Sequence, residues 1–308
     1  MVSQVSDISI VLMSMLSQIW QRQQLCEFLN KLEHTVQWIR AIYGRKLING
    51  RALLLLWLQI GLTFYDALTQ LVFLSKLAFK IDPWHFLVNL ASLYLQQYRA
   101  TLVLLIFGSI ILLTACYEQM AYYLENISTG PADELMHFQD LILLHNALNG
   151  LLRQLKGIFQ LPICLIVCGE FINVLANLYA QLYYYVITRA WWLAFVFYCA
   201  KLCIELYLLI HVVHFCCKQQ KRVAHLFLDR DIDLKEGAEC RFELTHSDAL
   251  WPQSIRFDIL GLFELNNEFL LFLISYSVNF VVMILQFGFY TSVATQIIFH
   301  LPNVPKRF

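Results

Sequence analysis

Long apolar runs separated by short polar connections dominate the pattern of hydrophobic and polar positions along the chain. Five runs are long enough for a helix to cross the hydrocarbon core of a bilayer, which takes about 20 residues. They cover residues 52–74, 100–124, 158–187, 190–217 and 268–300. Because a helix satisfies its own backbone hydrogen bonds in lipid, the pattern predicts an all-α, polytopic membrane bundle with five full spans.

Two further segments precede the first full span. The apolar run 8–20 is too short to cross a bilayer, and it lacks the basic start and the small-residue cleavage site of a signal peptide. It therefore reads as the end of a partial N-terminal helix. Residues 21–51 mix basic residues with apolar ones at helical spacing, which predicts an amphipathic helix. Its apolar positions are Leu25, Phe28, Leu29, Leu32, Val36 and Ile39.

Composition supports a single membrane domain over residues 1–308. Charged residues make up 14% of the chain, against about 25% in soluble domains, and 59% of the residues are hydrophobic. Lys plus Arg and Asp plus Glu each number 22. A net charge of zero gives no basic surface for nucleic acid, so the expected environment is the lipid bilayer and no nucleic-acid partner is expected.

Basic residues that flank the spans predict the orientation, because cytoplasmic connections carry the excess of Lys and Arg. Segments 21–51, 125–157 and 218–266 together hold fifteen, whereas the opposite side holds six. The N-terminus is therefore predicted to be cytoplasmic and the C-terminus extracellular. This orientation is opposite to that of a G-protein-coupled receptor, and the last span also lacks Asn-Pro-x-x-Tyr.

Charged side chains inside spans are costly and usually face protein or water. Lys201 and Glu205 are four residues apart on one helix and are expected to neutralise each other. Asp66 and Glu170 have no such local partner. For Asp66 the sequence leaves two roles open, ligand contact and structural hydrogen bonding.

The last span carries a narrow polar stripe on a helix that has no Asp, Glu, Lys or Arg between residues 269 and 301. At about 100° per residue, Ser275, Asn279 and Gln286 fall within roughly 40° of one another, and Tyr290 extends the stripe by one turn. A water-filled pore shared between subunits and an interhelical hydrogen-bond seam both explain this spacing.

Catalytic and metal chemistry find little support in the sequence. His211 and His214 share a helix face near Cys216, Cys217 and His225, which permits a zinc reading beside the alternative of interfacial packing. No nucleophile elbow, glycine-rich phosphate loop or paired catalytic carboxylate is present. We therefore expect no enzyme activity, no cofactor and no metal.

The segment from Phe257 to Phe287, FDILGLFELNNEFLLFLISYSVNFVVMILQF, resembles the C-terminal signature of insect gustatory receptors. Gly261-Leu262-Phe263 and the following Leu265-Asn266 match the family pattern. Five apolar residues from position 281 then lead to Gln286-Phe287. The family's Thr-Tyr pair is replaced here by Asn279-Phe280, which keeps an aromatic residue and loses the hydroxyls.

The resemblance implies more than a fold. Members of this family have seven spans and are similar in fold to insect odorant receptors. They assemble as tetrameric, ligand-gated cation channels whose last helix lines the pore. The pore and gate residues implied here are Gln286 and Phe287, with Asn279 and Tyr290 on the same helix. The implied role is a gustatory chemoreceptor that responds to small-molecule tastants as a homo- or hetero-tetramer in the plasma membrane.

The resemblance also places a ligand pocket among the outer halves of the earlier helices. The polar and aromatic candidates there are Tyr65, Asp66, Gln70, Tyr94, Gln97, Tyr179, Tyr183, Trp191 and Trp192. An aromatic membrane belt would explain the aromatic members equally well.

Family chains are longer, and this sequence reads as N-terminally truncated, without the first span and most of the second. A non-conducting or accessory subunit is therefore the alternative function. A secondary transporter is disfavoured because we find neither inverted repeats nor broken helices.

Overall fold

A computed structural model describes residues 2–43, 50–78, 83–126, 131–188, 193–237 and 255–300. The helices are α1 (Val2–Trp20), α2 (Arg22–Tyr43), α3 (Gly50–Ala78), α4 (Pro83–Asn126), α5 (Pro131–Thr188), α6 (Leu193–Gly237) and α8 (Asn267–His300). Two short strands, β1 (Asp258–Ile259) and β2 (Phe263–Glu264), precede α8. Within these residues, five helices are long and apolar enough to cross a membrane, which confirms the all-α membrane fold.

The central helices are longer than the apolar runs that predict them. At 1.5 Å per residue, the 58 residues of α5 extend roughly 87 Å, about three times the hydrocarbon thickness. α5 begins at Pro131 and runs through the predicted span 158–187 as one helix, with Pro162 buried inside it. α6 likewise continues to Gly237, well past the end of the predicted span at residue 217. Both helices therefore extend out of the bilayer without a break.

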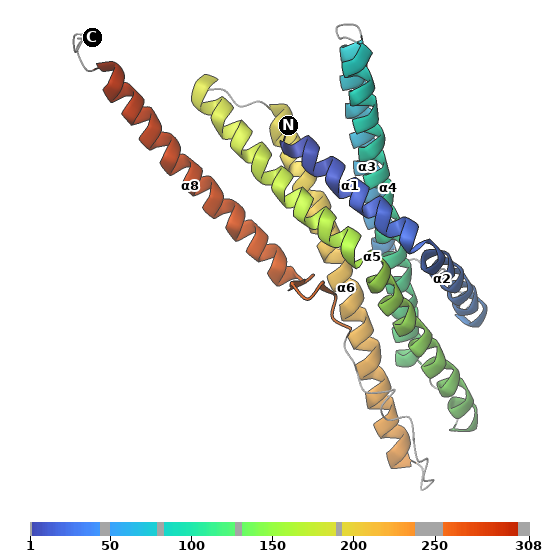
Figure 1. Cartoon of the computed structure of the whole chain (residues 1–308). Helices are drawn as coiled ribbons and strands as arrows, with labels where there is room; N and C mark the ends of the chain where they lie inside the picture. The colour runs from blue at the N-terminus through green and yellow to red at the C-terminus, as the bar shows by residue number, and fades with distance from the viewer. Residues whose placement is uncertain are drawn as a thin grey trace.

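The hydrophobic core lies where the lower halves of α4, α5 and α6 pack together (Figure 1). Phe107 and Tyr117 of α4, Phe159 of α5 and Phe227 of α6 are each at most 1% exposed. In a bundle surrounded by lipid, close packing of such rings holds the helices together through van der Waals contact. This part of the bundle is the fixed frame from which the other helices diverge.

The predicted amphipathic helix is α2, and its apolar face closes the core from one side. Phe28, Leu32, Val36 and Ile39 are buried, at spacings of three and four residues. Leu29, which lies off this stripe, is 36% exposed. The periodicity therefore identifies the buried face correctly.

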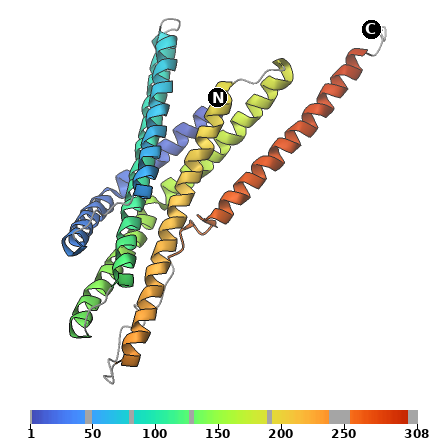
Figure 2. The same ribbon diagram turned by 180° about the vertical axis from the view of Figure 1, so that it is seen from behind.

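α8 diverges from the bundle, with its far end well separated from the ends of the neighbouring helices in both views (Figures 1 and 2). Its start is held by a β-hairpin in which Asp258 pairs with Glu264 and Ile259 with Phe263. Leu260 and Gly261 form the turn with φ of 51° and 69°, a left-handed conformation that suits Gly and strains Leu. The Gly-Leu-Phe motif therefore covers part of the turn and the first residue of β2, in the hairpin that positions the last helix.

Contacts with α5 fix this hairpin in place. Lys156 of α5 forms an ion pair with Asp258 and donates a hydrogen bond to the backbone oxygen of Arg256 at 3.2 Å. The bond from Lys156 lowers the pKa of Asp258. The side-chain oxygen of Asn266 then accepts from the backbone N–H of Phe269 at 2.9 Å and so caps the N-terminus of α8.

Candidate functional site

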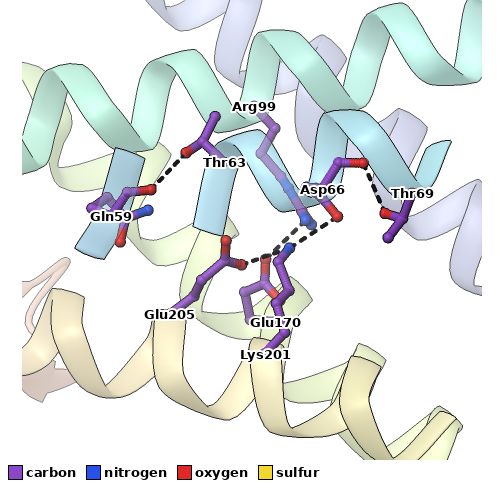
Figure 3. A network of polar contacts seen from close by, with 8 residues as sticks. All are labelled: Gln59, Thr63, Asp66, Thr69, Arg99, Glu170, Lys201 and Glu205. Atoms are coloured by element: carbon purple, nitrogen blue, oxygen red, sulfur yellow. Dashed lines mark hydrogen bonds and ion pairs between the residues drawn. The ribbon is translucent and has the colours of Figure 1, made fainter. Parts of the chain in front are cut away.

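Five charged side chains from four helices meet inside the bundle (Figure 3). Asp66 comes from α3, Arg99 from α4, Glu170 from α5, and Lys201 with Glu205 from α6. We call these five residues the charged cluster. Lys201 Nζ lies 2.9 Å from a carboxylate oxygen of Glu205 and 3.3 Å from one of Asp66. Arg99 Nη2 lies 3.0 Å from Glu170 Oε1.

The charged cluster is shielded from solvent. The Lys201 side chain is 4% exposed, and the most exposed of the five, Glu205, reaches 15%. Each isolated charge at this depth would cost several kcal/mol in lost hydration. Pairing offsets part of that cost, and it links α3 with α6 and α4 with α5.

The charged cluster confirms the predicted pairing of Lys201 with Glu205, and it shows the partners of Asp66 and Glu170. Lys201 and Glu205 do form the expected ion pair along α6. Asp66 and Glu170, which have no partner on their own helices, find Lys201 and Arg99 on neighbouring ones. For Asp66 the ion pair with Lys201 therefore supplies the structural role, and the same side chain lines a cavity.

Arg99 and Gln59 are polar residues of this site that the sequence reading missed. Both are buried, at 8% and 2% exposed. Arg99 falls at the edge of an apolar run, so it counts as an ordinary flanking residue in a linear scan. Gln59 is seven residues before Asp66, two helical turns on the same face, and this spacing is a signal the sequence does contain.

The other predicted pocket residues do not gather at the cluster as a set. Tyr65, Tyr94 and Tyr179 are 44%, 65% and 51% exposed, as expected of side chains that face lipid or a partner. Gln97 is half-buried. Trp191, Trp192 and the side chains of Gln70 and Tyr183 lie outside the described residues.

The polar stripe of α8 faces away from the bundle. Residues that are buried or half-buried recur every three or four positions at Leu273, Ser277, Phe280 and Ile284. Ser275, Asn279 and Gln286 are exposed, and at 100° per residue their face is centred roughly 150° from the packed face. Within this one chain, the stripe is therefore not an interhelical hydrogen-bond seam.

The two predicted gate residues occupy different positions around α8. Phe287 is 67% exposed and lies about 100° around the helix from Gln286. The side chain of Tyr290 lies outside the described residues. Gln286 thus shares the outward polar face with Asn279, whereas Phe287 flanks it.

The His and Cys residues of α6 pack as ordinary helix side chains. The His211 ring stacks between Tyr207 and Phe215, with centroids 5.4 Å and 6.4 Å away. Across the described ranges there is no group of three His, Cys, Asp or Glu residues placed to hold a metal ion. The cysteines in those ranges are free thiols.

Two comparisons with known proteins describe the relatives of this chain. The profile of a family described as 7tm chemosensory receptor matches residues 1–291. The chain is also 31% identical over 287 residues to the Drosophila melanogaster protein named "Putative gustatory receptor 89a". That alignment covers 92% of this chain and 74% of the relative. The family match includes the hairpin and runs well into α8.

Proposed function

Because the chain belongs to the insect gustatory receptor family, a family of multi-pass membrane chemoreceptors, we propose that it is a channel subunit. In this proposal it forms a ligand-gated, non-selective cation channel of the plasma membrane that responds to small-molecule tastants. The functional assembly is a homo- or hetero-tetramer with related subunits.

The outward polar face of α8 is the observation that carries this proposal. Only 6% of the most apolar stretch of α8 is buried by its own chain, so most of its surface meets lipid or other subunits. Asn and Gln side chains are costly against hydrocarbon. Grouping several copies of α8 around a common axis would place Asn279 and Gln286 in a shared, hydrated path.

Poor selectivity among cations follows from the residues of this helix. Between Phe269 and the end of α8 there is no Asp, Glu, Lys or Arg, so a ring of Gln286 side chains offers uncharged amide groups to a passing ion. A neighbouring ring of Phe287 would close the path by excluding water.

The proposed orientation places the hairpin end of α8 in the cytoplasm and its far end outside. It rests on the excess of basic residues in segments 21–51, 125–157 and 218–266 of the sequence. Figure 1 draws the start of α1 toward the same end of the bundle that the far end of α8 reaches. In this arrangement α2 is cytoplasmic, whereas the start of α1 points toward the outer end of the bundle, unlike the cytoplasmic N-terminus that the sequence predicts.

The ligand pocket is proposed among the outer halves of α3 to α6, where Asp66 is buried beside Tyr65. Alanine substitutions at the nine predicted pocket positions, assayed by ligand dose–response, test it. Shifted sensitivity at Asp66 together with the neighbouring tyrosines supports the pocket, and unchanged sensitivity at all nine positions rejects it.

Recordings from cells that express the chain, alone and with a full-length family member, test the channel proposal. Gln286→Glu should favour cation over anion permeation, and Gln286→Arg should do the reverse. Phe287→Ala should raise the current without ligand. Ile284→Gln is the control, because that side chain lies on the packed side of α8, about 160° from the polar face.

Channels that conduct, yet keep the same leak and ion preference in all three variants, would show that α8 does not line the pore. If no current arises with either expression scheme although the protein reaches the membrane, the non-conducting alternative holds.

A further inference from the structure

A small cavity adjoins the charged cluster. Its walls come from α3, α4, α5 and α6 and include Gln59, Asp66, Glu170 and Lys201. Its volume is about 20 Å³, enough for one water molecule or another group of that size.

The charges around this cavity do not balance. Asp66, Glu170 and Glu205 supply three carboxylates, whereas Arg99 and Lys201 supply two cations. Arg99 pairs with Glu170, and so Lys201 is shared between Asp66 and Glu205 (Figure 3). The five charged residues among those that line the cavity therefore carry a net charge of −1. An uncompensated charge in the interior of a membrane bundle is strongly unfavourable, so one more positive charge would stabilise the site.

Gln59 adds an uncharged ligand group to the same cavity. Its side chain lines the cavity and is 2% exposed, and its amide makes no hydrogen bond to any of the residues that the structure describes. The hydrogen bond at this residue, from Thr63, goes to the backbone oxygen instead. The amide oxygen, like a carboxylate oxygen, is a group that binds ammonium and hard cations.

We propose that this cavity is a binding subsite for one small cationic group about the size of an ammonium. The carboxylates of Asp66 and Glu205 supply the charge, and the Gln59 oxygen supplies a third contact. The inference deepens the proposed function, and rests on it in taking the occupant to be the amine of a tastant. A free Na⁺ shares the same chemistry, and the test below separates the two sources.

Equilibrium binding of radiolabelled methylammonium to the full chain in lipid nanodiscs tests this subsite directly. We expect saturable binding of one methylammonium per chain at constant ionic strength. Glu205→Gln makes the five-residue set neutral and should lower the affinity at least about tenfold. Glu33→Gln removes a carboxylate from the exposed face of α2 and should leave binding unchanged.

Asp66→Asn provides a second neutral cluster should Glu205→Gln fail to fold, and it should lower the affinity to a similar degree. Gln59→Leu keeps every charge, removes the third contact, and should weaken binding less. Added NaCl, with N-methylglucamine chloride as the matched salt, separates the sources. Displacement by Na⁺ at a comparable concentration assigns the site to the inorganic ion, and resistance to Na⁺ assigns it to an amine.

Two results would overturn the subsite. One is the absence of saturable binding by the wild-type chain between pH 6 and 9, which would mean that a proton carries the missing charge. The other is equal binding by the wild-type chain, Glu205→Gln and Asp66→Asn. Neither result depends on current, so the subsite can fail while the channel proposal stands, and the channel can fail while the subsite binds.

Discussion

α4 and α8 are both long apolar helices, yet they have opposite relations to the rest of the chain. In the most apolar stretch of α4, 61% of the residues are buried inside the protein, whereas in α8 the share is 6%. Hydropathy alone does not distinguish the two, because lipid tails and a protein core are equally apolar surroundings.

The polar residues of the two helices do distinguish them. In α4, Ser109 and Thr114 bond to the backbone of their own helix, and Tyr117 donates to Asn149 of α5 at 2.9 Å. In α8, Asn279 and Gln286 turn away from the bundle. A helix whose polar groups form hydrogen bonds within the chain has a structural role. A helix that presents its polar groups outward is suited to line a path for ions.

Lys201→Met should destabilise the helix bundle more than any other substitution considered below. It leaves the carboxylates of Asp66 and Glu205 buried beside each other without their shared cation, at a cost of about 3–5 kcal/mol. We expect little folded protein, measured as the monodisperse fraction in detergent and as the temperature at which it is lost.

Lys31→Met is the matched control, because it removes the same charge from an exposed position on α2 and should behave as wild type. A normal yield of Lys201→Met would show that the charged cluster does not stabilise the bundle.

Two substitutions, one in α4 and one in α8, test whether the polar groups of the two helices differ in their contribution to stability. Tyr117→Phe deprives Asn149 of its 2.9 Å hydrogen bond in a buried site and should cost about 1–2 kcal/mol. Asn279→Leu should leave the stability of the isolated chain unchanged, since this side chain is exposed. Thermal unfolding of both variants measures the difference. Equal losses of stability would contradict the claim that Asn279 of α8 faces away from the bundle.

The membrane spans and the buried face of α2 could be predicted from the sequence, because they depend on residues close to one another along the chain. Five apolar runs give five spans, and the spacing of Phe28, Leu32, Val36 and Ile39 identifies the buried face of α2. Lys201 and Glu205 pair along one helix, so a four-residue spacing suffices to predict the contact.

The long-range part of the site could not be predicted in the same way. The pairing of Arg99 with Glu170 joins residues on different helices, and it depends on how α4 and α5 are rotated toward each other. The hairpin before α8 was also missed, because each strand has two residues, too few for a strand pattern. Its turn motif was recognised only as part of a family signature.

Gly261→Ala should weaken the base of α8 by about 1 kcal/mol. A Cβ at φ 69° adds strain although nothing lies within 4 Å of it. We expect faster proteolysis around the hairpin, with the core of α4, α5 and α6 unaffected. Proteolysis at the wild-type rate would show that this turn does not hold the helix.

Asn126→Gln should have no effect. We expect that Asn126 carries no glycan, so glycosidase treatment should leave the mass of the wild-type chain and of this variant unchanged. Asn126 ends α4 at the end of the bundle assigned to the cytoplasm, where its Asn-Ile-Ser sequence does not meet the glycosylation machinery. A glycosidase-sensitive shift that this substitution abolishes would reverse the proposed orientation, and with it the cytoplasmic place of the hairpin.

Block of current by a positively charged, thiol-reactive methanethiosulfonate reagent tests most directly the claim that α8 lines a shared pore. The reagent is applied to channels that carry Gln286→Cys, Asn279→Cys or Ile284→Cys, with the otherwise wild-type chain as the baseline. Gln286 and Asn279 lie on the outward polar face, and Ile284 lies on the packed face. A pore lined by the polar face of α8 predicts rapid block at 286 and 279 and none at 284. Equal modification at all three positions, or block at 284 alone, would contradict it.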